Sequence, residues 1–116
     1  MTKIIDWNIN QRDGAWCDLV KSGADVALIQ EACRPPVEIA TQIEVDSSPW
    51  ATAGLGLRRP WRTAVVKLSD RVEVRWFEQR ELHEAARGEF GVSRLGTLAV
   101  ALITPTSGEP FLVASM

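Results

Sequence analysis

The sequence has few cysteines and no long apolar run. Cys17 and Cys33 form no CxxC pair and are too few for a disulfide framework, so a disulfide-stapled class is excluded. We expect both thiols to be reduced and buried as small apolar side chains, which fits a cytoplasmic protein. No apolar run reaches the roughly 18 residues that a membrane span requires. Because Asp6 interrupts the apolar N-terminal stretch, we expect that this stretch is not a signal peptide.

The sequence also lacks an excess of positive charge. Its 13 basic and 15 acidic residues give a net charge of −2 with histidine neutral. A protein held on nucleic acid by overall charge is strongly basic, so this class is disfavoured, although a local basic patch can coexist with an acidic total. The 116 residues are 46% hydrophobic and 24% charged, which predicts one globular domain and excludes disorder.

What is present begins with a strand, a helix and a second strand. The apolar run 3–9 predicts a largely buried strand that places Trp7 in the core. Residues 15–21 carry a single apolar helical face that includes Trp16, and residues 24–30 predict a continuous buried strand. About 14 residues separate the strands, which is long enough for a parallel crossover.

Polar residues stand at the carboxyl ends of both predicted strands, where Asn8 and Glu31 lie. Because the carboxyl ends of parallel strands meet at one edge of a sheet, we expect this amide and this carboxylate to converge there. Asp6 and Asp25 are predicted to be solvated or to cap nearby backbone. The turn after the first strand lacks a glycine-rich phosphate cradle, so a nucleotide-binding domain is disfavoured.

The rest of the chain predicts mainly antiparallel strands. The segments are a short helix after Pro35-Pro36, a loop over 46–60, strands over 63–68 and 72–77 joined by a hairpin turn at 69–71, a helical turn over 82–87, and strands over 94–104 and 110–116. The fold class is therefore α/β, with a parallel start and an antiparallel remainder.

These features resemble the N-terminal half of the endonuclease/exonuclease/phosphatase superfamily. That family opens with a strand ending in a W-N pair, here Trp7-Asn8, and returns in a strand ending in Q-E, here Gln30-Glu31. The resemblance implies half of a four-layer α-β-β-α sandwich, with a mixed sheet that begins as a parallel strand–helix–strand unit. Residues 1–116 would then form a single partial domain.

The resemblance also implies a metal-dependent phosphoesterase that hydrolyses phosphodiester bonds, with nucleic acid as the default substrate. Glu31 matches the family's metal-ligating carboxylate and Asn8 its amide beside the metal, so both are candidate catalytic residues and ligands for one or two Mg²⁺ or Mn²⁺ ions. The family's later histidine and its D-x-N and D-H pairs lie beyond Met116, and His83 matches none of them. We therefore expect weak metal binding and little or no hydrolysis by this chain alone.

A cluster of arginines surrounds Trp61, and Arg62 is the candidate substrate-binding residue among them. Cations with an interleaved aromatic ring can contact phosphates and stack on bases, although a solvated loop is the alternative. A half domain would also leave an apolar sheet face open. The alternative function is therefore a non-catalytic binding or assembly module, whose sheet forms a homodimer or pairs with a complementary chain.

Overall fold

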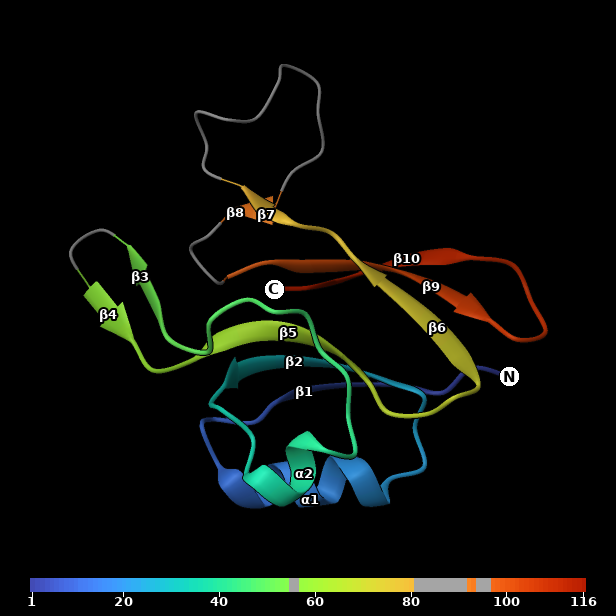
Figure 1. Ribbon diagram of the computed structural model, residues 1–116, viewed down its shortest axis with the longest axis horizontal. Coiled ribbons are helices and arrows are strands. Elements are labelled where there is room, and N and C mark those ends of the chain that lie inside the picture. Colours follow the sequence, from blue (N-terminus) through green and yellow to red (C-terminus); the bar gives the residue numbers. More distant parts are fainter. Residues whose placement is uncertain (55–56, 81–91, 94–96) are drawn as a thin grey trace.

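The computed structural model describes residues 1–54, 57–80, 92–93 and 97–116. Within these ranges two three-stranded sheets lie one over the other, and two helices cover the outer face of one sheet (Figure 1). The predicted α/β class, with a mixed sheet and later antiparallel strands, is confirmed. None of the helices that the structure describes is long and apolar enough to cross a bilayer.

The first sheet contains the predicted parallel unit. β1 (Ile4–Asn8) pairs in parallel with β2 (Val26–Ala32), and α1 (Asp13–Lys21) makes the crossover between them. β5 (Arg62–Lys67) pairs antiparallel with the other side of β2, so β2 is the central strand. A central parallel strand is covered on both faces, which explains the continuous apolar run in its sequence.

A hydrophobic core lies between this sheet and the helices. α1 buries Trp16 and Leu19 against the sheet, and α2 (Val37–Ala40) adds Ile39. The buried members of this core are Ile9, Ala15, Trp16, Leu19, Ala27, Ile29, Ala32, Ile39, Ile43, Ala64 and Val66. Full burial of a side chain such as Leu19 stabilises the fold by about 1.5–3 kcal/mol.

The second sheet packs on the opposite face of the first. It consists of β6 (Val72–Trp76), β9 (Ala99–Pro105) and β10 (Phe111–Ser115), all antiparallel, in the order β10-β9-β6. A second core forms between the sheets from Val26, Val65, Val72, Ala101 and Ile103. The indole N–H of Trp76 donates to the carbonyl of Val65 at 2.8 Å, which joins the two layers directly.

The expected hairpin between residues 63–68 and 72–77 is wrong. β5 and β6 belong to different sheets, so residues 69–71 carry the chain from one layer to the next. The physical reason is that β5 pairs with β2, whereas β6 pairs with β9. The apolar face of each sheet is then buried against the other sheet. The sheet face that we expected to be open is consequently covered. On the outer side of the second sheet, Leu112 remains 61% exposed.

The first strand is also less buried than its sequence predicts. β1 lies at the edge of its sheet, and Ile4 is 39% exposed. Trp7 is half-buried against the helix-side core, whereas Asp6 and Asn8 on alternate positions are exposed. An edge strand therefore leaves Asn8 accessible to solvent.

Other local predictions also require correction. The predicted loop 46–60 contains a short antiparallel hairpin, β3 (Thr52–Gly54) with β4 (Leu57–Arg59). Cys17 is exposed on α1 and Cys33 is half-buried, because neither position faces fully into the core.

One further short pair is present: β7 (Gln79–Arg80) runs parallel to β8 (Val92–Ser93). The helical turn predicted over 82–87, with His83, lies outside the described residues.

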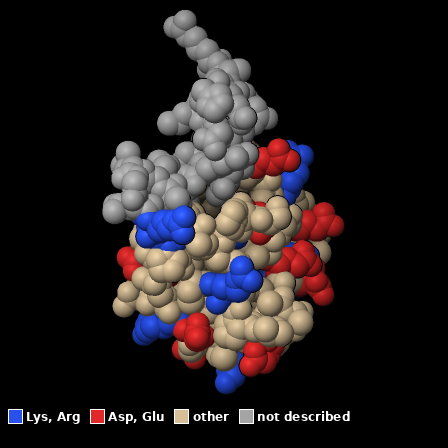
Figure 2. All heavy atoms as spheres, turned by 60° about the vertical axis from the view of Figure 1, so that its left-hand side comes forward, with Lys and Arg blue, Asp and Glu red and all other residues tan. Residues whose placement is uncertain are grey.

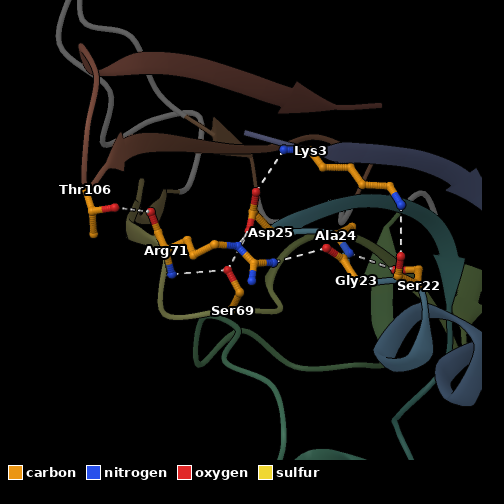
Figure 3. Close-up of polar contacts among 8 residues, drawn as sticks. All are labelled: Lys3, Ser22, Gly23, Ala24, Asp25, Ser69, Arg71 and Thr106. Carbon is orange, nitrogen blue, oxygen red and sulfur yellow. Dashed lines mark hydrogen bonds and ion pairs between the residues drawn. The ribbon is translucent and has the colours of Figure 1, made fainter. Parts of the chain in front are cut away.

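Asp25 is only 3% exposed, so the expectation that it is solvated is wrong, whereas the alternative that it caps nearby backbone agrees with the backbone N–H that it accepts. Its carboxylate accepts hydrogen bonds from the backbone N–H of Lys3 at 2.8 Å and from the hydroxyl of Ser69 at 2.6 Å (Figure 3). The Nε–H of Arg71 donates to the same carboxylate at 2.6 Å. The side chain and backbone N–H of Thr106, in the turn after β9, both donate to the Arg71 carbonyl. This Asp25 cluster thus joins β1, the start of β2 and the connection between the sheets.

Burial alone would raise the pKa of Asp25. The hydrogen bonds from Ser69, Lys3 and Arg71, together with the charge of Arg71, outweigh it and hold the pKa below its ordinary value. Because the folded state has the lower pKa, the ionised cluster stabilises the fold fully above about pH 4, and this contribution falls as the pH drops through the native pKa.

We predict that Asp25→Asn lowers the free energy of unfolding at neutral pH by about 2–4 kcal/mol, because an amide cannot accept all three hydrogen bonds or pair with Arg71. The difference in the free energy of unfolding between the variant and the parent should shrink below about pH 4. Urea unfolding at several pH values measures this difference. Asp70→Asn, in the same connection but fully exposed, is the matched control and should change little. A deficit for Asp25→Asn that does not change with pH would contradict the prediction.

Candidate functional site

The two strand ends predicted to converge lie side by side. Asn8 is the register partner of Gln30 in the parallel ladder. The ladder continues into the following turn, where the N–H of Ile9 donates to the carbonyl of Gln30 at 3.1 Å. The N–H of Gln11 then donates to the carbonyl of Glu31 at 2.9 Å. Asn8 and Glu31 therefore lie at the same edge of the first sheet, the one formed by the carboxyl ends of β1 and β2.

A β-bulge determines the surroundings of Glu31. The register between β2 and β5 shifts between Ile29 and Ala32, and both of these residues belong to the helix-side core. Strict alternation would place residue 31, not residue 32, on that apolar side. The extra residue therefore takes Glu31 out of the core, and Glu31 is half-buried at the sheet edge.

Backbone strain is concentrated at the same edge. Asn10, Gln11 and Glu31 have φ angles of 47°, 57° and 49°, and they are the only non-glycine residues with positive φ in the described ranges. Such a conformation costs a residue other than glycine about 1–2 kcal/mol. The Oδ1 atom of Asn8 accepts the N–H of Asn10 at 3.0 Å, which supports the first of these residues. Strained backbone of this kind gathers at functional sites.

A polar network that the sequence did not reveal holds the second sheet against this edge. The side-chain amide of Gln30 donates to Asp6 Oδ1 and to Ser115 Oγ, both at 2.9 Å. The hydroxyl of Ser115 donates in turn to the carbonyl of Ile29 at 2.9 Å. Ser115 is buried, so the end of β10 is fixed beside Asn8 and Glu31. The available signal was a glutamine that directly follows the apolar run 26–29.

Arg62 has different surroundings from those expected of a substrate-binding residue. It is 0% exposed, and its guanidinium donates to Asp46 Oδ1 at 2.7 Å. The same group lies 4.3 Å from the ring centre of Trp50. Trp50 meets Trp16 edge to face with ring centres 5.5 Å apart. In this structure Arg62 therefore supports the loop before β3 and does not present its charge to solvent.

The other arginines of the predicted cluster lie nearer the surface. Arg58 is exposed, and the Arg59 guanidinium lies 5.4 Å from the ring centre of Trp61. The hydroxyl of Thr52 donates to the Trp61 carbonyl at 3.0 Å, which closes the base of the β3–β4 hairpin. This hairpin and the carboxyl end of β2 occupy the left-hand side of Figure 1. Figure 2 brings that side forward and shows basic groups interspersed with acidic groups and uncharged surface.

The donor atoms at the edge suit a hard divalent cation but are few. Glu31 offers a carboxylate, and the Asn8 carbonyl oxygen keeps a second lone pair beyond the one that Asn10 uses. Mg²⁺ prefers six oxygen ligands and accepts several waters among them. In the part of the chain that the structure describes, no group of three or more His, Cys, Asp or Glu side chains is placed to hold a metal ion. Glu31 and Asn8 thus have the donor chemistry of metal ligands, but two such residues would supply only part of a metal site.

We predict that Glu31→Gly is more stable than Glu31→Ala by about 1 kcal/mol, because only glycine adopts the left-handed backbone at this position without strain. Chemical denaturation of the two variants measures the difference. The same pair of substitutions at Glu38, in helix α2, is the control, and there alanine should be the more stable variant. Equal stabilities at position 31 would show that the bulge carries no strain.

We also predict that Asp46→Ala lowers the free energy of unfolding by about 3 kcal/mol, because it leaves the buried Arg62 guanidinium without its carboxylate. Glu44→Ala is the matched control, since Glu44 is largely exposed and lies 3.8 Å from Lys67. That control should change stability little. Thermal unfolding of both variants measures these changes in stability. Equal losses of stability in Asp46→Ala and Glu44→Ala would contradict a special role for the buried ion pair.

Comparison with protein-family models finds no match, and comparison with curated proteins finds none either. Among solved structures, the chain is similar to the endonuclease domain of TRAS1, a telomere-specific non-LTR retrotransposon, with a TM-score of 0.57 and 18% sequence identity. The similarity covers 98% of this chain and 44% of that structure. The fold of this chain is therefore similar to that of slightly less than half of that domain.

Proposed function

We propose that this chain is the N-terminal part of a metal-dependent phosphoesterase of the nuclease type, in which Glu31 and Asn8 help to hold Mg²⁺ or Mn²⁺. The observation that carries the proposal is the strained sheet edge, where a bulge turns a carboxylate out of the core beside an accessible amide. The similarity of the fold to an endonuclease domain supports this chemistry. Fold similarity alone does not fix a reaction, so the proposal depends on the edge itself.

The residues at the edge have separate tasks in this proposal. Glu31 supplies a charged oxygen ligand, and Asn8 supplies a neutral oxygen to the ion or an N–H donor to a phosphate. Gln30 and Ser115 are positioning residues, because their hydrogen bonds fix the end of β10 against the edge. A bound divalent ion would neutralise charge that develops on the phosphate and help to orient water.

The substrate that we propose is a phosphodiester, with nucleic acid as the default. The exposed Arg58 and the Arg59–Trp61 contact lie on the side of the molecule where β1 and β2 end, so a phosphate backbone there would meet positive charge. One carboxylate and one amide hold Mg²⁺ weakly, and we propose that the chain by itself hydrolyses little or no phosphodiester.

The second candidate function is a non-catalytic binding module. It is favoured by the small number of ligands among the described residues and by the exposure of Leu112 on the outer face of the second sheet. It differs from the phosphoesterase proposal in one measurable respect: a binding module has no need of a metal at Glu31.

The test is paramagnetic broadening of backbone amide signals by Mn²⁺, which detects even binding in the roughly millimolar range. We predict that substoichiometric Mn²⁺ broadens the amides of Asn10, Gln11 and Glu31 first, and that Glu31→Gln removes this selectivity. Glu109→Gln is the matched control, because Glu109 is an exposed acid in the turn before β10. It should leave the broadening unchanged.

Broadening that is the same in the parent and in Glu31→Gln would remove the metal site and favour the binding module. Broadening that follows Glu31 but is lost in Asn8→Ala would make Asn8 a ligand to the ion. Broadening that survives Asn8→Ala would leave Asn8 the role of a phosphate donor.

A further inference from the structure

A cleft of about 560 Å³ lies beside α2, on the helix side of the first sheet. Its volume is within the roughly 300–1,000 Å³ range of small-molecule sites. Two prolines, Val37 and Trp50 form the apolar part of its wall. Arg34, Ser47 and Ser48 supply polar groups.

Trp50 is held in place before any ligand arrives. The fully buried Arg62 guanidinium lies under its ring at 4.3 Å, and Trp16 meets it edge to face. Arg62 does not border the cleft, whereas Trp50 does, so part of the indole can be reached from the cleft. A ring fixed in this way loses little conformational entropy when a flat ligand stacks on it.

The charges around the cleft favour an anionic ligand. The Asp46 carboxylate is engaged by Arg62 and by the hydroxyl of Ser48. Arg34 is exposed and has no ion-pair partner within the described ranges. The lining therefore combines an aromatic surface, hydroxyl groups and one unpaired cation, which is the combination that a nucleotide uses for its base and its phosphate.

The cleft is also close to the proposed metal edge. Arg34 follows Glu31 by three residues, so their Cα atoms lie at most about 10 Å apart. Ala32 is the ladder partner of Arg62, the residue that supports Trp50. A nucleic-acid strand with a phosphate at Glu31 would bring an adjacent base within reach of the cleft.

We infer that this cleft binds a nucleobase of a single-stranded segment next to the proposed phosphodiester site, by stacking on Trp50 with the backbone phosphate at Arg34. The inference rests on the proposed function for its choice of ligand. The inference adds a base-binding position to the proposed site at Glu31 and Asn8, which would otherwise contact only metal and phosphate.

Fluorescence anisotropy with two labelled probes tests the inference. One probe is a short single-stranded oligodeoxynucleotide, and the other is an abasic strand of the same length, which keeps the phosphates and lacks the bases. EDTA is present, so the metal edge does not contribute. We expect the probe with bases to bind about tenfold tighter or more, since stacking on an aromatic ring has this effect.

Three variants test whether the base is bound in this cleft. Val37→Glu adds a negative charge at the cleft on a side chain that is 82% exposed, so it should weaken binding of the base-containing probe several-fold without unfolding the protein. Leu112→Glu makes the same change in charge on the outer face of the second sheet, and it should have little effect. Trp50→Phe keeps an aromatic ring and should reduce the preference for bases.

Equal affinity for the two probes, or equal effects of Val37→Glu and Leu112→Glu, would overturn the inference. The metal proposal has its own readout. A chain that shows Mn²⁺ broadening at Glu31 but no base preference keeps the phosphoesterase proposal and loses the base position. A chain that prefers bases but shows no broadening keeps the base position as a nucleic-acid binding site and loses the phosphoesterase proposal.

Discussion

The parallel pairing of β1 with β2 is the constraint on which the candidate site depends. A parallel ladder puts both carboxyl ends at one edge, so Asn8 and the residues after Gln30 must be neighbours. The α1 crossover enforces this arrangement by burying Trp16 and Leu19 over the sheet. The strained turn after β1 then connects to Glu31 through a backbone hydrogen bond. The positions of Asn8 and Glu31 at this edge thus follow from the backbone pairing and do not depend on contacts of their side chains.

Two polar clusters join the layers at opposite ends of the central strand. At the amino end of β2, the buried Asp25 carboxylate links the N-terminal segment to the connection between the sheets. At the carboxyl end, Gln30 and Ser115 link the sheets beside the candidate site. The apolar core between the sheets supplies nondirectional stabilisation, whereas these hydrogen bonds fix how the layers are aligned.

The sequence predicted what depends on local periodicity and missed what depends on distant partners. The strand–helix–strand unit was found because apolar spacing distinguishes a strand from a helix. The crossing between sheets at 69–71 was missed, since the apolar pattern of a strand does not indicate which other strand it pairs with. The burial of Asp25 and of Arg62 was missed because their partners, Ser69 and Asp46 among them, are far away in the chain. The bulge at Glu31 has no local signature at all.

The bulge in β2 has a consequence for how such a chain can change over time. Loss of one codon at position 31 would restore regular pairing with β5 and leave the helix-side core in place, since Ala32 already belongs to it. A single deletion would therefore remove the carboxylate of the proposed metal site while the architecture persisted. Two chains with this scaffold can therefore differ in whether they present a carboxylate at this point, so the extra residue in β2 distinguishes them where the overall shape does not.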